Sequence, residues 1–114
     1  MIRYGFSRRQ AEPILAIFLE WVVSEGGGPS YNAYRIEKAW KEVSGTQEHT
    51  VRTFFKDGIL YVTLDSSVLR SHLSHLTDSL QGALNAALDR DERFLKGYSF
   101  SRKVDKIVLK CSRL

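Results

Sequence analysis

The chain has 114 residues, which suits a single domain with a core large enough to fold without disulfide bonds. Its apolar content of 43% and charged content of 26% are typical of a soluble globular protein. Seventeen Lys and Arg against thirteen Asp and Glu give a net charge of +4, a mild preference for polyanionic partners. The single cysteine, Cys111, excludes an internal disulfide and suits a reducing compartment, so we expect a cytoplasmic protein.

The N-terminal third predicts a lead-in and two helices. Residues 1–11 are basic and predict a flexible lead-in to a single domain over residues 12–114. Pro13 suits the first turn of a helix over residues 14–25 that is apolar nearly all round. This helix is too short to span a membrane, and Glu20 interrupts it. A second helix is expected from Ser30, with Gly45 as its C-terminal cap.

The remaining chain predicts two strands, a long helix and a third strand. The strands are expected at 49–56 and 59–65, and Ser66 or Ser67 then caps a helix with leucines at three- and four-residue steps: Leu69, Leu73, Leu76, Leu80 and Leu84. Residues 89–103 are charged and irregular and read as an insertion, and residues 104–111 as the last strand. The order α-α-β-β-α-β predicts a small α+β domain with its helices on one face of a three-stranded sheet.

The dipeptide Asp57-Gly58 predicts a two-residue hairpin turn, which fixes the register of the first two strands. Lys56 then pairs with Ile59, and Phe54 with Tyr61. The core face is expected to carry six residues: Val51, Thr53, Phe55, Leu60, Val62 and Leu64. If the last strand buries Ile107, Leu109 and Cys111, the outer face collects two aromatic rings and four cations: Arg52, Phe54, Lys56, Tyr61, Lys106 and Lys110.

Such an outer face is suited to single-stranded nucleic acid, because bases stack on aromatic rings while Lys and Arg neutralise phosphates. Further cations near the two ends would grip the phosphates beside the sheet: Arg8, Arg9, Arg102 and Lys103. Two other interpretations remain open. Aromatic cross-strand pairs stabilise sheets without any ligand, and the helix over 14–25 or a second copy of the chain could cover this face.

No arrangement in the sequence predicts catalysis, a metal site or a cofactor. His72 and His75 are three residues apart on the long helix but lack a third ligand nearby, so solvated histidines are expected. Residues 89–92 begin like a calcium loop, but Phe94 stands where that loop requires glycine. No nucleophile, base and orienting group can be assembled, and we expect neither an enzyme nor a small-molecule substrate.

Several short motifs in a fixed order resemble the DciA family. They are Trp40 to Gly45 at a helix end, His49-Thr50, Asp57-Gly58 in the turn, Asp65-Ser66-Ser67, Leu84-Asn85, and the strand residues Ile107-Val108-Leu109. The resemblance covers about residues 30–88 and 104–111. The ordered set is more specific than any single motif.

The resemblance implies a KH-like α+β domain, with a role in DNA replication as a factor that assists loading of the replicative helicase and binds single-stranded DNA. It brings no catalytic residues. The chain lacks the Gly-x-x-Gly loop by which KH domains grip nucleic acid. The alternatives are a protein–protein adaptor or dimerisation domain without a nucleic-acid role, docking through the helix over 14–25 or through the outer sheet face, and an RNA-binding KH-like module.

Overall fold

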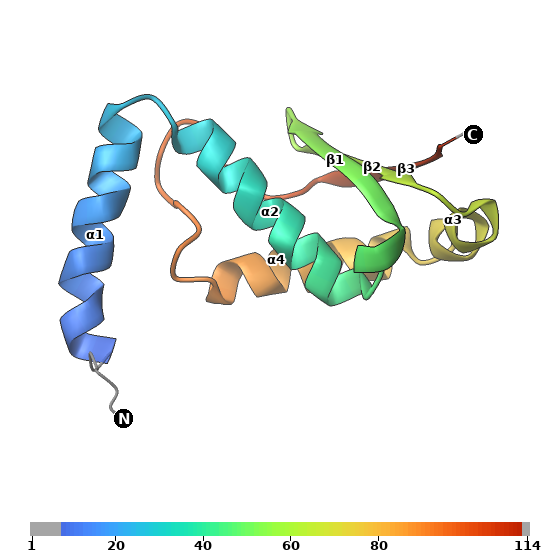
Figure 1. Ribbon diagram of the computed structural model, residues 1–114, viewed down its shortest axis with the longest axis horizontal. Coiled ribbons are helices and arrows are strands. Elements are labelled where there is room, and N and C mark those ends of the chain that lie inside the picture. Colours follow the sequence, from blue (N-terminus) through green and yellow to red (C-terminus); the bar gives the residue numbers. More distant parts are fainter. Residues whose placement is uncertain (1–7, 113–114) are drawn as a thin grey trace.

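The computed structural model describes the backbone of residues 8–112 and the side chains of residues 14–112. It confirms an α+β domain in the predicted order (Figure 1). The elements are α1 (Arg8–Ser24), α2 (Gly28–Ser44), the short 3-10 helix η1 (Gln47–His49), β1 (Thr50–Lys56), β2 (Ile59–Leu64), α3 (Ser67–Ser74), α4 (Thr77–Arg90) and β3 (Lys106–Cys111). Among the described helices, none has the length and apolar character needed to cross a bilayer.

The sheet is mixed, with the strand order β1-β2-β3. β1 and β2 form the predicted hairpin, in which Asp57 and Gly58 both have positive φ angles, 55° and 81°, as a tight turn between right-twisted strands requires. β3 runs parallel to β2, so the chain must cross back over the sheet between them. Helices α3 and α4 and the segment 91–105 make that crossover.

The hairpin register is as predicted from Lys56↔Ile59 to Arg52↔Thr63. Beyond Arg52 the prediction was wrong. The register shifts between Thr50 and Arg52, so that Thr50 instead of Val51 pairs with Leu64. A bulge of this kind places one extra residue on one strand and turns its side chain away from the expected face. Val51, expected in the core, is consequently exposed.

The core lies between the inner face of the sheet and helices α2 and α4 (Figure 1). Leu60, Val62 and Leu64 of the central strand β2 are fully buried against Ile36 and Trp40 of α2. On β3, Ile107 is buried and Leu109 packs at the edge of the core, while Cys111 is half-buried. Helix α3 contacts one end of β2 and β3, and α1 contacts α2 instead of the sheet.

The helix predicted as one continuous element after Ser66 is two helices. Ser66 does cap the first, because its Oγ accepts a hydrogen bond from the Leu69 N–H at 3.1 Å. α3 ends at Ser74, and α4 begins at Thr77. The leucine spacing continues across this short break, which is why periodicity alone could not show it. Leu76, expected on the core stripe, lies at the break and is exposed.

The charged segment 89–103 is packed against the core rather than lying apart from it. Phe94, Leu95 and Val104 are buried. Asn32 of α2 binds both backbone groups of Leu95, donating to its carbonyl at 2.9 Å and accepting from its N–H at 2.8 Å. Asn85 of α4 binds Val104 in the same way, at 2.8 and 2.9 Å. Two asparagines thus hold the irregular segment, one at its middle and one just beyond its C-terminal end.

Helix α1 begins at Arg8, earlier than Pro13, so residues 8–11 of the predicted lead-in are helical and residues 1–7 lie outside the described part. Phe18 contacts Tyr31 of α2 edge to face, with ring centroids 6.3 Å apart. Four large apolar side chains of α1, Phe18 among them, are nevertheless exposed: Ile14, Ile17, Phe18 and Trp21. Their spacing of three and four residues forms one stripe along the helix. Figure 1 shows α1 beside the first turn of α2, away from the sheet.

Candidate nucleic-acid interface

The outer face of the sheet collects the predicted aromatic and basic side chains. Phe54 and Tyr61 are directly paired across the hairpin, with ring centroids 6.0 Å apart and ring planes at 35°. Phe54 is 57% exposed, and Tyr61 is half-buried among its neighbours. In the described part of the chain no helix lies over these rings, since α2 and α4 pack on the other face. The predicted placement of one phenylalanine inward and its neighbour outward is therefore observed.

Three cations border the two rings. Lys110 of β3 places its Nζ 5.3 Å from the centroid of the Tyr61 ring, a cation–π distance. Arg52 and Lys56 lie on the same side of β1 as Phe54 and are exposed. Together with Thr53, Thr63 and the rings they line an open hollow of about 540 Å³. The register puts no acidic residue on this face of the three described strands.

Three of the other predicted cations, on β3 or in the segment before it, lie at different places. Lys106 pairs with Ile59 in the register and is exposed on the outer face, at the end of the sheet nearest the hairpin turn. Arg102 lies beside the same turn, close to Gly58, and its Nη2 binds the Asp105 carboxylate at 2.8 Å, which partly neutralises it. Lys103 is directed to the helical side, where it pairs with Asp89 of α4 at 2.9 Å.

Arg8 and Arg9 are not brought to the sheet. Their backbone forms the first turn of α1, and their side chains lie outside the described residues. Figure 1 shows this end of α1 at the side of the molecule farthest from the hairpin. The structure therefore gathers Arg52, Lys56 and Lys110 around the rings, places Lys106 and Arg102 near the hairpin turn, and separates Lys103 from them.

The sequence analysis missed one exposed aromatic residue, which lies on the helical side of β1 and not on the outer face. Tyr34 of α2 is 51% exposed and lines a second, smaller groove of about 400 Å³ with Phe54 and Phe55. Tyr34 lies off the apolar stripe of Ile36 and Trp40, so an exposed position could have been expected from helical spacing. The closeness of Tyr34 to β1 could not have been expected, because it depends on how α2 crosses the sheet.

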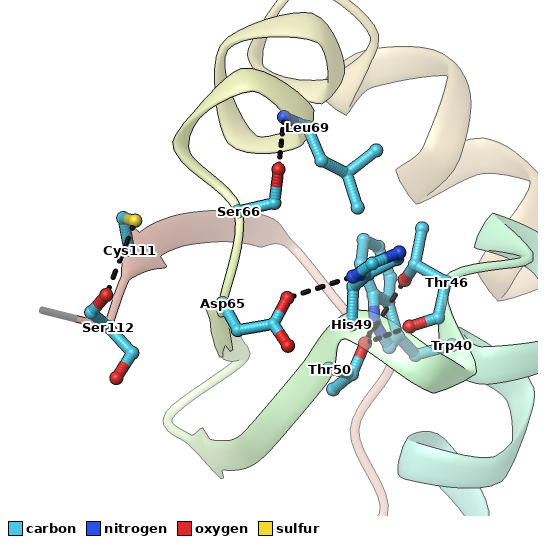
Figure 2. Close-up of polar contacts among 9 residues, drawn as sticks. All are labelled: Trp40, Thr46, His49, Thr50, Asp65, Ser66, Leu69, Cys111 and Ser112. Atoms are coloured by element: carbon cyan, nitrogen blue, oxygen red, sulfur yellow. Dashed lines mark hydrogen bonds and ion pairs between the residues drawn. The ribbon is translucent and has the colours of Figure 1, made fainter. Parts of the chain in front are cut away.

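Part of the set that carries the family resemblance lies at the end of the hairpin away from the turn (Figure 2): Trp40, His49, Thr50, Asp65 and Ser66. Trp40 Nε1–H donates to Thr50 Oγ1 at 3.2 Å, and the Thr50 hydroxyl in turn donates to the Thr46 carbonyl at 2.8 Å. His49 Nδ1 lies 2.9 Å from Asp65 Oδ1, and the Asp65 N–H donates to the His49 carbonyl at 3.0 Å. These contacts join the start of β1 to the end of β2.

The residues next to the His49–Asp65 pair do not supply the further ligands that a metal site would need. Ser66, the next residue, uses its hydroxyl to cap α3, as Figure 2 shows. Among the side chains of residues 14–112, no group of three or more His, Cys, Asp or Glu is placed to hold a metal ion. Cys111 is half-buried, and its Sγ lies 3.6 Å from the Ser112 carbonyl oxygen.

Comparison of the sequence with protein-family models identifies a family. The family model described as "Dna[CI] antecedent, DciA" matches residues 14–93, well over half of the 114-residue chain. No curated protein and no solved structure matches. The match begins at residue 14 within α1, a helix that the ordered motifs did not cover, and it stops before β3, so the final strand of the predicted pattern lies outside it. The chain therefore belongs to the DciA family, a family associated with replication and with loading of the replicative helicase.

Proposed function

We propose that this protein is a non-enzymatic accessory factor of DNA replication, which assists loading of the replicative helicase and binds single-stranded DNA on the outer face of its sheet. Family membership supports the helicase partner. The observation that carries the DNA-binding role is the open ring pair of Phe54 and Tyr61 bordered by Lys110. A cytoplasmic location and a KH-like fold remain predictions that accompany this proposal.

The physical basis is the combination of a stacking surface with unneutralised positive charge. Each base that stacks on an aromatic ring contributes about 1–3 kcal/mol, whichever base it is. No ion pair to an acidic residue is found for Arg52, Lys56 or Lys110 within the described residues, so these cations are available to phosphates. Binding of this kind recognises a strand by its backbone and its unpaired bases, and it tolerates any sequence.

The test is fluorescence anisotropy with a labelled oligothymidylate. Tyr61→Ala should weaken binding by about 5- to 150-fold, the equivalent of one lost stacking contact. Lys110→Gln should weaken binding and also reduce the dependence of affinity on salt between about 50 and 200 mM. The matched control is Lys103→Gln, which removes the same charge from the helical side and should bind like the wild type.

Three results would contradict the DNA-binding role: no binding at low salt, wild-type affinity for Tyr61→Ala, or equal losses for the Lys103 and Lys110 variants. The same titration with oligouridylate decides between DNA and RNA, because an RNA-binding module should prefer the latter. Capture of the replicative helicase on the immobilised protein, with and without oligothymidylate, tests the helicase role separately.

A protein–protein adaptor is the second candidate, and the exposed stripe on α1 favours it. Ile17 is 68% exposed and Trp21 59%, and a helix side of this kind is usually covered by another helix. A second copy of the chain is the occupant to test, by sedimentation of the wild type and of Ile17→Glu. A dimer that Ile17→Glu dissociates would support this candidate, and a monomer at every concentration would remove it.

A further inference from the structure

The first strand, β1, is an edge strand flanked by aromatic side chains on both of its faces. In the described part of the chain β2 is its single neighbour in the sheet. Phe54 projects from the outer face, and on the inner face the groove of about 400 Å³ lies between β1 and α2. Ala33 and Tyr34 form one wall of the groove, and Phe55 with Leu60 forms the other. An edge strand presents unpaired backbone N–H and C=O groups along its length.

We propose that the edge of β1 is a docking site for an extended, acidic and amphipathic segment of a partner protein, which adds a fourth strand to the sheet. Main-chain hydrogen bonds to β1 would supply the affinity, and the side chains of the added strand would alternate between the two faces. One set would enter the groove beside Tyr34, and the other set would lie next to Arg52 and Lys56.

The charge of β1 decides which kind of occupant fits. β1 carries Arg52 and Lys56 on its outer face and contains no acidic residue. Pairing with β1 of a second copy would bring these cations close to their own equivalents, and like charges facing each other across a strand pair are destabilising. A partner strand with Asp or Glu at alternate positions turns the same cations into cross-strand ion pairs. The edge therefore disfavours its own copy and favours an acidic strand.

The groove determines which side chains the partner strand would carry on its other face. More of the groove lining is apolar than polar, with the Tyr34 ring, which is 51% exposed, and the Phe55 side chain among its apolar residues. Glu37 also lines the groove, and its carboxylate is paired with Lys41 at 3.0 Å. Lys38 Nζ lies 5.9 Å from the Tyr34 ring centroid. A valine or leucine side chain there would be removed from water. The occupant is thus a strand that alternates acidic and branched apolar residues.

The test uses a synthetic peptide of alternating glutamate and valine, as long as β1, titrated into isotopically labelled protein and followed by NMR. Amide shifts should be concentrated in β1 and in the part of α2 that includes Ala33 and Tyr34. The matched control is the same peptide N-methylated at alternate residues, which cannot pair along one edge and should bind at least about tenfold more weakly. Tyr34→Ala should weaken peptide binding several-fold and leave oligothymidylate binding unchanged. Lys110→Gln should weaken oligothymidylate binding and leave peptide binding unchanged.

Each alternative outcome overturns the proposal. Equal binding of the N-methylated peptide would show that strand pairing is not involved, and shifts centred away from β1 would place the peptide elsewhere. Absence of binding would refute an acidic strand as the occupant. Shifts in β1 that depend on protein concentration alone would make a second copy the occupant. The DNA-binding role has a separate readout, so either can fail without the other.

Discussion

The two-point contact between Asn32 and Leu95 should be one of the most stabilising single-residue interactions in this domain. The Asn32 side chain is 4% exposed and satisfies both backbone groups of Leu95, which is itself buried. Replacing Asn32 by alanine leaves a buried N–H and a buried C=O without partners. Each costs about 1–3 kcal/mol, and since water can enter the space partly, we expect a loss of about 2–4 kcal/mol in the free energy of unfolding.

The assay is urea unfolding followed by the fluorescence of the tryptophans, of which Trp40 is fully buried. A loss of this size corresponds to a midpoint temperature lowered by about 8–16 °C in a domain of this length. Asn32→Asp is the sharper variant, because it keeps the shape and the acceptor but replaces the donor to the Leu95 carbonyl with an oxygen. It should cost at least as much as alanine at neutral pH.

The matched control is Ser30→Ala, an exposed substitution in the same helix, which should change stability by less than about 0.5 kcal/mol. If Asn32→Ala were equally neutral, the segment around Leu95 would not be held by this contact, and the packing of residues 89–103 described above would be wrong. Hydrogen exchange of the Leu95 amide gives an independent check, because its protection should fall in the variant.

Two further predictions concern the packing around α2 and α4. Gly28→Ala should destabilise the fold by about 1–3 kcal/mol, because a Cβ there would overlap the Phe100 ring, and Phe100→Ala should relieve that cost. Gly82→Ala, which meets open space in α4, should stabilise the fold by about 0.5–1 kcal/mol. Urea unfolding measures all of these changes. Burial lowers the pKa of the Arg35 guanidinium, but the 2.8 Å hydrogen bond to Asp91, the attraction of the Asp91 charge and two nearby tyrosines together outweigh burial and raise that pKa overall. A double-mutant cycle with Arg35→Met and Asp91→Asn should give a coupling of about 1–3 kcal/mol, and additive losses would contradict it.

The parts of the fold that local chemistry governs could be predicted from the sequence. Asp57-Gly58 adopts the positive φ angles of a tight turn, and a turn of two residues leaves one register for the strands next to it. That register placed Phe54 and Tyr61 on the outer face and Leu60, Val62 and Leu64 in the core. The ring pair of the candidate interface follows from these two residues at the turn.

The rest of the candidate interface depends on contacts between distant parts of the chain. Arg102 and Lys103 are neighbours in sequence, yet Asp105 holds one at the hairpin turn and Asp89 holds the other on the helical side. The groove beside β1 exists because α2 crosses the inner face of the sheet near Tyr34. No local pattern encodes either arrangement.

The sequence by itself determined the order of the elements, the turn, and the inward and outward alternation along the strands, because each of these depends on residues a few positions apart. The tertiary structure alone decided the bulge that turns Val51 outward, the division between α3 and α4, and the packing of residues 89–103 by Asn32 and Asn85. The physical reason is that buried backbone groups outside helices and strands must find partners, and those partners can lie anywhere in the chain. Leu95 finds its partner 63 residues away in sequence.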